Sequence, residues 1–143
     1  SHVNANLADN LGAVSLADAL MAPTTLYVKP MLDLLPQLDV HAMAHITGGG
    51  ITENIIRVVP DGLGLDIDAS AIVLPPVFDW LKRSGNVAPA EMWRTFNCGI
   101  GFVLIVPQAA AAAIGAELDA LELPHWRIGE VTAAGDGERV RIG

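Results

Sequence analysis

HAMAHITGGGITEN, residues 41–54, is the stretch that decides how the middle of this chain folds. Its first part alternates small and apolar residues, which predicts a strand over residues 40–46. After the three glycines, apolar residues recur at the helical period, which predicts a helix over residues 51–59. The expected order is strand, glycine turn and helix, and such a turn either binds a ligand or only turns a corner.

Strand and helix patterns alternate along the rest of the chain. Helices are predicted over residues 16–21, 30–38, 75–85, 89–93 and 108–121, and strands over residues 63–67, 99–106, 126–131 and 140–142. This order predicts an α+β (layered α/β) domain in which a mixed sheet is packed with helices.

The domain is expected to occupy residues 16–143, after a loosely ordered arm over residues 1–15. Ser1 and His2 resemble the remnant of a cleaved tag, and the chain starts without Met. We therefore expect an excised piece of a longer protein.

The composition limits the classes of protein to which the chain could belong. With 143 residues, 52% of them apolar, the chain is long enough to bury the core of one domain. No apolar run reaches the roughly 18 residues that a membrane span needs. The net charge of -8 argues against nucleic-acid binding, which depends on clustered Lys and Arg. The single cysteine, Cys98, cannot form an internal disulfide, which favours a reducing cytoplasm.

The glycine turn is the first candidate binding site. Gly48, Gly49 and Gly50 let the backbone approach a ligand closely, and the N–H groups at the start of the following helix favour an anion such as phosphate. The pattern is neither the Walker nor the dinucleotide motif, so a purely structural turn is the alternative. The hydroxyl of Thr47 could cap the helix or contact a phosphate oxygen.

The charged and polar side chains around the turn also have two interpretations. Glu53, followed by Asn54, either responds to the helix dipole or orients a ribose hydroxyl or an amine. His41 and His45 share one face of the predicted strand about 13 Å apart, which is too far to share a metal ion, and zinc is not expected. We expect a structural hydrogen bond for His41, and a substrate contact or proton transfer for His45.

A second unusual stretch, RTFNCGIG, occupies residues 94–101 at a predicted junction of helix and strand. It contains a cation, Arg94, and two hydrogen-bonding side chains, Thr95 and Asn97. Together they would form the polar wall of a pocket. Gly99 and Gly101 indicate a close approach to the strand. Cys98 is interpreted as buried and inert, because no neighbouring base is identifiable. The guanidinium of Arg94 could form a structural ion pair or contact a ligand, and spacing does not decide between them.

Four longer segments resemble one enzyme family. They are APTTLYVKPMLDLL (22–35), HAMAHITGGGITENIIRVVPDGLG (41–64), LPPVFDWLKRSGNVAPAEMWRTFNCGIGFVLIVP (74–107) and WRIGEV (126–131). In this order they are similar to the C-terminal half of the phosphoribosylformylglycinamidine cyclo-ligases, also called aminoimidazole ribonucleotide synthetases. The resemblance is an ordered series of motifs, which makes chance a poor explanation.

The resemblance implies an activity with its cofactors and partners. Members of this family are cytoplasmic, dimeric enzymes of purine biosynthesis. They use ATP and magnesium to close formylglycinamidine ribonucleotide into aminoimidazole ribonucleotide, releasing ADP and phosphate. The family's N-terminal domain, which handles ATP and magnesium, has no counterpart in this chain. We therefore expect the isolated chain to be inactive and to bind neither cofactor tightly.

The resemblance also implies a partial ferredoxin-like topology and a cleft with this domain as one wall. The expected cleft residues are His45 and Asn97 as catalytic residues and Thr47, Gly48, Gly49, Gly50, Glu53, Asn54, Arg94 and Thr95 as substrate-binding residues, with Cys98 in support. The glycine turn is expected to hold a phosphate group, and no metal ligand is expected. The alternatives are the C-terminal domain of a selenophosphate synthetase or hydrogenase-maturation relative, and a non-catalytic interaction module.

Overall fold

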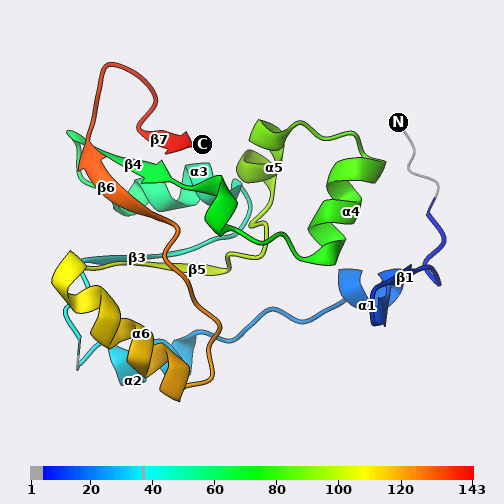
Figure 1. The fold of residues 1–143 in the computed structure, drawn as a ribbon, viewed down its shortest axis with the longest axis horizontal. Helices are drawn as coiled ribbons and strands as arrows, with labels where there is room; N and C mark the ends of the chain where they lie inside the picture. The colour runs from blue at the N-terminus through cyan, green and yellow to red at the C-terminus, as the bar shows by residue number, and fades with distance from the viewer. Residues whose placement is uncertain (1–4, 37) are drawn as a thin grey trace.

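The computed structural model describes residues 5–36 and 38–143, and the tag remnant expected at Ser1 and His2 lies outside these ranges. The elements in chain order are β1 (Asn10–Leu11), β2 (Val14–Ser15), α1 (Leu16–Leu20), α2 (Val28–Leu34), β3 (Ala42–His45), α3 (Gly50–Ile55), the 3-10 helix η1 (Ile56–Val58), β4 (Leu63–Ile67), η2 (Ala69–Ala71), α4 (Pro76–Ser84), α5 (Pro89–Thr95), β5 (Phe102–Ile105), η3 (Gln108–Ala110), α6 (Ala111–Ala120), β6 (Gly129–Ala133) and β7 (Val140–Ile142). Figure 1 shows an elongated molecule with β3 to β7 toward one end and α1, β1 and α4 toward the other.

Two small sheets form the main β part of the fold. β3 and β5 form an antiparallel ladder from Ala42↔Ile105 to His45↔Phe102. β4 lies between β6, which is antiparallel to it, and β7, which is parallel. The order β3, α3, β4, β5, α6, β6 follows the β-α-β-β-α-β order of ferredoxin-like domains, with α4 and α5 inserted before β5. The predicted α+β class with a mixed sheet is confirmed.

The main core is formed by buried side chains of β3, α3, β4, β5 and their connections. Its members are Ala44, Ile46, Ile51, Ile55, Val59, Leu65, Ile67, Ile72, Ile100 and Val103. Because side chains alternate along a strand, Ala44 enters this core while Met43 and His45 remain exposed. The helices α2 and α6 both lie on one side of β3 and β5 (Figure 1), and α2 buries Met31 and Leu34.

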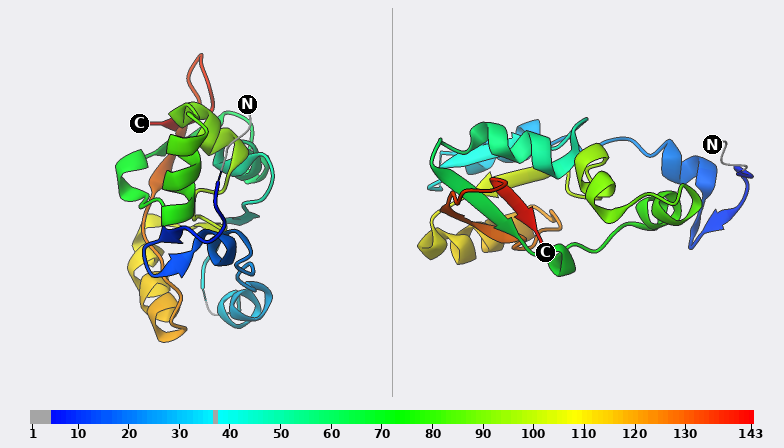
Figure 2. Two further views of the ribbon diagram at one scale, coloured as in Figure 1. Left: turned by 90° about the vertical axis from the view of Figure 1, so that its right-hand side faces the viewer. Right: turned by 90° about the horizontal axis from the view of Figure 1, so that it is seen from above.

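The N-terminal arm contains two short strands that the sequence did not predict. β1 and β2 form a hairpin around Gly12, whose φ of 71° lies in the left-handed region. Ser15 caps α1 by accepting a hydrogen bond from the Asp18 N–H at 3.1 Å. α1 and β1 contact α4, and Leu16 is completely buried. An extended segment over residues 22–27 joins this unit to α2 (Figure 2).

The boundaries of α2 differ from the prediction for a reason that lies in its prolines. The helix begins at Val28, because Pro30 occupies its third position, where no N–H is needed. It ends at Leu34 instead of residue 38, since Pro36 has no N–H to continue the helical hydrogen bonds.

Two strands also differ from the predicted ranges. β5 starts only at Phe102, because the positive φ of Cys98 and Gly99 turns the backbone before it. β6 lies two to three residues after its predicted position, because pairing with β4 sets its register from Leu63↔Ala133 to Ile67↔Gly129. The other predicted helices and strands are present at their expected places along the chain.

Candidate functional site

The two unusual stretches of the sequence meet in the structure. β3 leads into the glycine turn and pairs with β5, which follows RTFNCGIG, so that His45 faces Phe102 across the ladder. Beyond the ladder, the N–H of Ile46 donates to the carbonyl oxygen of Gly101 at 2.9 Å. The glycine turn and the loop between α5 and β5 are therefore neighbours, although they are far apart in the sequence.

The three glycines of the turn are not equivalent. Gly50 is buried with a φ of 58°, and a Cβ built on it would overlap the carbonyl oxygen of Trp93 and lie 2.8 Å from that of Phe96. Packing against α5 therefore requires glycine at this position. Gly48 is exposed, and a Cβ built on it would meet nothing within 4 Å. Of these two, only Gly48 borders open space.

Asn54 holds the shape of the turn. Its residue is only 6% exposed, and its Nδ2 donates to the carbonyl oxygens of Thr47, Gly48 and Gly50 at 3.3, 3.1 and 2.8 Å. Its Oδ1 accepts from Arg57 Nη1 at 3.4 Å. Asn54 was expected to contact the substrate. In the structure its side chain instead donates hydrogen bonds to carbonyl groups of the turn.

The exposed side of the turn carries hydrogen-bond donors. The N–H of Gly50 donates to the Thr47 carbonyl oxygen at 3.0 Å, whereas the N–H groups of Gly48 and Gly49 have no acceptor in the described part of the chain. Gly49 has a φ of 96°, and a Cβ built on it would lie 2.8 Å from Glu53 Oε2, so that a carboxylate lies beside the turn. Successive N–H groups in a turn with a left-handed residue are a known type of anion site. The N-cap of α3 is Gly49 and no side chain caps this helix, so the Thr47 hydroxyl does not act as its cap.

Glu53 and Arg94 link the two stretches at the surface. Arg94 Nε lies 3.4 Å from Glu53 Oε1, and Arg94 Nη1 lies 3.8 Å from Glu91 Oε1. The Arg94 side chain is 64% exposed and that of Glu53 50%, and an ion pair with such exposure contributes about 0 to 1 kcal/mol. The structure thus shows the ion pair of Arg94, with the guanidinium still accessible. Thr95, the last residue of α5, is exposed as well.

Asn97 and Cys98 shape the loop between α5 and β5. Asn97 Oδ1 accepts from the Gly99 N–H at 3.1 Å, and the Asn97 carbonyl oxygen accepts from the Ile100 N–H at 2.8 Å. Cys98 is fully buried with its Sγ 3.4 Å from the Met92 carbonyl oxygen, and burial raises the pKa of the thiol to about 11. The prediction of a buried cysteine is confirmed. Because the thiolate is the nucleophilic form, a raised pKa agrees with the expectation that this cysteine is inert, which stays a prediction.

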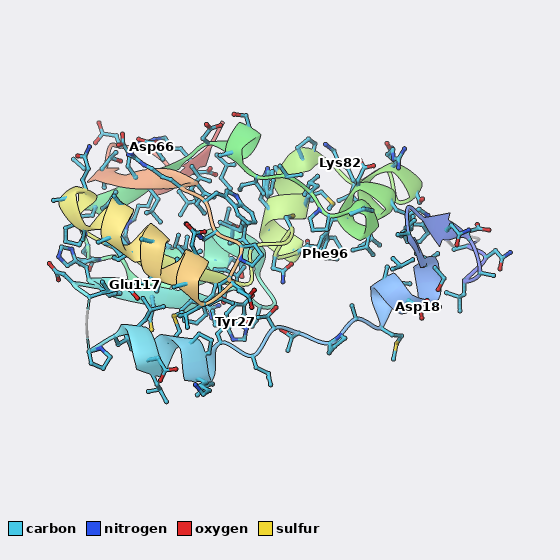
Figure 3. All side chains as sticks on the ribbon, turned by 60° about the horizontal axis from the view of Figure 1, so that its bottom comes forward. Asp18, Tyr27, Asp66, Lys82, Phe96 and Glu117 are labelled. Carbon is cyan, nitrogen blue, oxygen red and sulfur yellow. The ribbon has the colours of Figure 1, made fainter. Side chains whose placement is uncertain are left out.

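His45 has two aromatic neighbours that the sequence reasoning did not include in the site. The centroid of its ring lies 6.0 Å from that of Tyr27 and 6.2 Å from that of Phe102. Figure 3 shows Tyr27 near the end of α2 that adjoins the extended segment. Gly101 was the feature of the sequence that pointed to such a neighbour. A close approach to the strand was expected at this glycine, and the side chain that approaches it is that of Tyr27.

His41 is not part of this site. It precedes β3 and lies near Asp39, with 3.8 Å between His41 Nε2 and Asp39 Oδ1. Among residues 5–36 and 38–143, no three His, Cys, Asp or Glu side chains come together in a way that could hold a metal ion. No helix in the same ranges is long and apolar enough to cross a membrane.

A cavity of about 1190 Å³ lies between β5, α6 and the β4–β6 ladder. Its walls are formed mainly by aliphatic side chains and by the alanines of α6. The glycine turn over residues 47–50 does not line it, whereas Tyr27, Gly101 and Phe102 do. The glycine turn itself therefore lies at the surface and outside this cavity.

The fold and the site define an α+β domain with a glycine turn at the end of a two-stranded antiparallel sheet. Over residues 1–142 the sequence matches the family model described as AIR synthase related protein, C-terminal domain. The chain belongs to this family.

Several relatives named phosphoribosylformylglycinamidine cyclo-ligase are similar to the chain. The protein of Xanthomonas campestris pv. campestris (strain B100) is 69% identical over 132 residues, which cover 91% of this chain and 39% of that protein. The protein of Xanthomonas oryzae pv. oryzae (strain PXO99A) is 71% identical over 129 residues, covering 89% and 38%. The protein of Xylella fastidiosa (strain Temecula1 / ATCC 700964) is 61% identical over 130 residues, covering 90% and 37%. The chain thus spans less than two fifths of the length of these relatives.

A solved structure supports the fold. The crystal structure of tt0281 from Thermus thermophilus matches with a TM-score of 0.58 and 23% sequence identity, over 89% of this chain and 38% of that one. At this identity the match supports the architecture and says nothing about a ligand.

Proposed function

We propose that this chain is the C-terminal part of a phosphoribosylformylglycinamidine cyclo-ligase. The reaction closes formylglycinamidine ribonucleotide into aminoimidazole ribonucleotide at the expense of ATP, with ADP and phosphate released, in purine biosynthesis. The names of the relatives at 61 to 71% identity support this proposal. The observation that carries it is the meeting of the glycine turn with the loop before β5, which gathers exposed polar groups from both stretches at one surface.

In this proposal the turn holds the phosphate group of the ribonucleotide. The N–H groups of Gly48 and Gly49 would donate to phosphate oxygens, and the Thr47 hydroxyl would donate to another. The carbonyl groups of the turn are bonded to Asn54, which reduces their repulsion of an anion. Arg94 would keep its pairing with Glu53, which offsets the negative charge of that carboxylate beside Gly49, and its remaining N–H groups would donate to the phosphate.

His45 and Asn97 are proposed to orient the reacting centre. The imidazole of His45 lies at the end of β3 that leads into the turn, and it can donate or accept a proton. Asn97 uses Oδ1 for the Gly99 N–H, which leaves its Nδ2 as a donor toward a substrate oxygen.

The proposal places ATP and magnesium outside this chain. Magnesium binds through carboxylate oxygens, and no suitable cluster forms among the described residues. We therefore assign both cofactors to the part of the longer protein that this chain does not contain, together with the dimer contact. In this proposal the enzyme is cytoplasmic and the isolated chain is catalytically inactive.

Calorimetric titration of this chain with formylglycinamidine ribonucleotide, and separately with ATP, tests the proposal. We expect binding of the ribonucleotide but not of ATP. Gly48→Leu should abolish that binding without unfolding the chain, since the new side chain would stand in open space where the phosphate is expected. Gly137→Leu is the matched control, because a Cβ at Gly137 also meets nothing within 4 Å.

Equal ribonucleotide binding by Gly48→Leu and Gly137→Leu would contradict a phosphate site at the turn. Tight ATP binding by the isolated chain would contradict the assignment of the nucleotide to the rest of the enzyme. Cyclo-ligase activity of the isolated chain would contradict its proposed inactivity.

A further inference from the structure

Three aromatic rings from three segments converge beside the glycine turn. Tyr27 precedes α2, His45 ends β3 and Phe102 begins β5. Tyr27 and Phe102 have ring centroids 5.1 Å apart with planes inclined at 32°, and Tyr27 meets His45 edge to face at 6.0 Å and 64°. Aromatic pairs at these distances attract one another beyond the area that they bury. The imidazole of His45 thus has two aromatic rings as neighbours.

The Tyr27 side chain packs against Gly101, which has no side chain of its own. A Cβ built on Gly101 would overlap the Tyr27 hydroxyl oxygen and lie 2.9 Å from the adjoining ring carbon. Gly101 has no positive φ, so its backbone does not by itself demand glycine. The contact with Tyr27 is the reason the structure offers for a glycine here.

The backbone of Tyr27 is held independently of the site. Its carbonyl oxygen accepts the hydrogen bond from the Met31 N–H at 3.0 Å in the first turn of α2. Met31 is 7% and Leu34 3% exposed, which anchors this helix to the domain. The next residue, Val28, is 72% exposed, whereas Tyr27 is half-buried with its hydroxyl against Gly101.

We propose that Tyr27 is a positioning residue that fixes the His45 imidazole beside the glycine turn. The absence of a side chain at Gly101 provides the space for the Tyr27 ring. The inference rests on the proposed function, in which His45 orients the reacting centre. Tyr27 acts here through its ring and not through a contact of its hydroxyl with the ligand. The extended segment over residues 22–27 is thereby tied directly to the site.

The test combines nuclear magnetic resonance of the His45 ring protons with calorimetry on this chain. Tyr27→Leu should shift and broaden the His45 ring signals. It should weaken ribonucleotide binding up to about tenfold, which is the upper range for one aromatic pair. Ribose 5-phosphate, which would engage only the glycine turn, should bind Tyr27→Leu as it binds the unaltered chain. Tyr27→Phe should behave as the unaltered chain in all three measurements, because the ring is kept.

Gly101→Ala provides a second, independent disturbance, because its methyl group would displace the Tyr27 ring without removing it. It should reproduce the shifts of the His45 ring signals seen in Tyr27→Leu. If Tyr27→Leu fails to fold, Gly101→Ala alone tests whether Tyr27 positions the imidazole. Val28→Ala is the matched control, since it alters an exposed neighbour and should leave the His45 signals unchanged.

Unchanged His45 signals in folded Tyr27→Leu and Gly101→Ala would overturn the positioning role. Equal losses of ribonucleotide binding in Tyr27→Phe and Tyr27→Leu would overturn it too, because the hydroxyl would then be the contact. If the unaltered chain binds neither phosphate ligand, the proposed phosphate site fails. The His45 signals then still decide whether Tyr27 positions the imidazole.

Discussion

At the scale of single residues, the neighbouring glycines Gly48 and Gly50 have different roles in the structure. Gly50 is closed in by the backbone of α5, whereas Gly48 faces open space. Sequence alone presents them as equal members of one run, and only their neighbours in the fold distinguish them. The same holds for Asn54, which by spacing could contact a ligand and in the structure holds three carbonyl groups.

We predict that Gly50→Ala destabilises the chain by more than about 3 kcal/mol, because a left-handed φ and an overlap with an immovable carbonyl group combine. Gly48→Ala should change the free energy of unfolding by no more than about 0.5 kcal/mol. Urea denaturation of both variants measures the difference. Similar stabilities for the two variants would contradict the packing of α5 on Gly50.

We predict a loss of stability in alkali that is due to Cys98. Burial raises the pKa of its thiol from 9.0 to about 11, so between these values the unfolded chain loses a proton that the folded chain keeps. The contribution is fully present below pH 9 and is lost as the pH rises to 11, by on the order of 2 kcal/mol. Denaturation at several pH values measures it.

Cys98→Ala is the comparison for this alkaline effect, because other groups also titrate between pH 9 and 11. The dependence of stability on pH over that window should be shallower in the variant than in the unaltered chain. Parallel curves would show that the thiol titrates alike in the folded and unfolded states.

At the scale of elements, Arg139 joins the start of β7 to the turn before β4. Its guanidinium donates to the carbonyl oxygens of Val59, Pro60 and Leu63 at 2.9, 2.7 and 2.9 Å and lies 3.4 Å from Asp61. Such a fork of donors on one cation bridges several acceptors at once. The parallel pairing of β7 with β4 follows directly after this contact.

We predict that Arg139→Ala lowers the free energy of unfolding by about 1 to 3 kcal/mol, since three carbonyl groups lose a charged partner. Arg139→Lys should recover only part of this, because an ammonium group lacks the planar fork. Arg127→Ala is the control: its side chain is 65% exposed, and the change should be no more than about 0.5 kcal/mol. Thermal or urea unfolding checks all three. Full rescue by lysine would contradict the role of the fork.

At the scale of the whole molecule, the chain divides into a larger part around the two sheets and a smaller one formed by α1, the β1–β2 hairpin and α4 (Figure 2). The segment over residues 22–27 connects them on one side without regular structure. Within the smaller part, Leu16 is completely buried. Such partial units of a protein can open separately from the main core.

We predict that Leu16→Ala removes about 2 to 5 kcal/mol of local stability, because it leaves a cavity where the side chain was. Hydrogen exchange should show faster exchange in α1 and α4 but little change in β3, β4 and β5. Equal acceleration in all of these elements would instead show that the two parts unfold together.

The class of the fold and the approximate positions of its helices and strands could be predicted from the sequence. The ends of α2 were wrong because Pro30 was placed at its start and Pro36 was not weighed as its end. The hairpin of β1 and β2 was not predicted, because strands of two residues are too short to show a periodic pattern. The position of β6 was wrong because register depends on the partner strand.

By itself, the sequence determined the α+β class, the place of the glycine turn between strand and helix, and membership of a family. These follow from local periodicity and from ordered motifs, which need no knowledge of long-range contacts. Only the tertiary structure decided that Gly50 serves α5, that Asn54 shapes the turn and that Tyr27 meets His45 over Gly101. Gly50 and α5, like Tyr27 and His45, are distant in the chain, and only the packing of the elements brings them together. Asn54 is close to the turn in the sequence, but spacing does not show whether its side chain points to the turn or to a ligand.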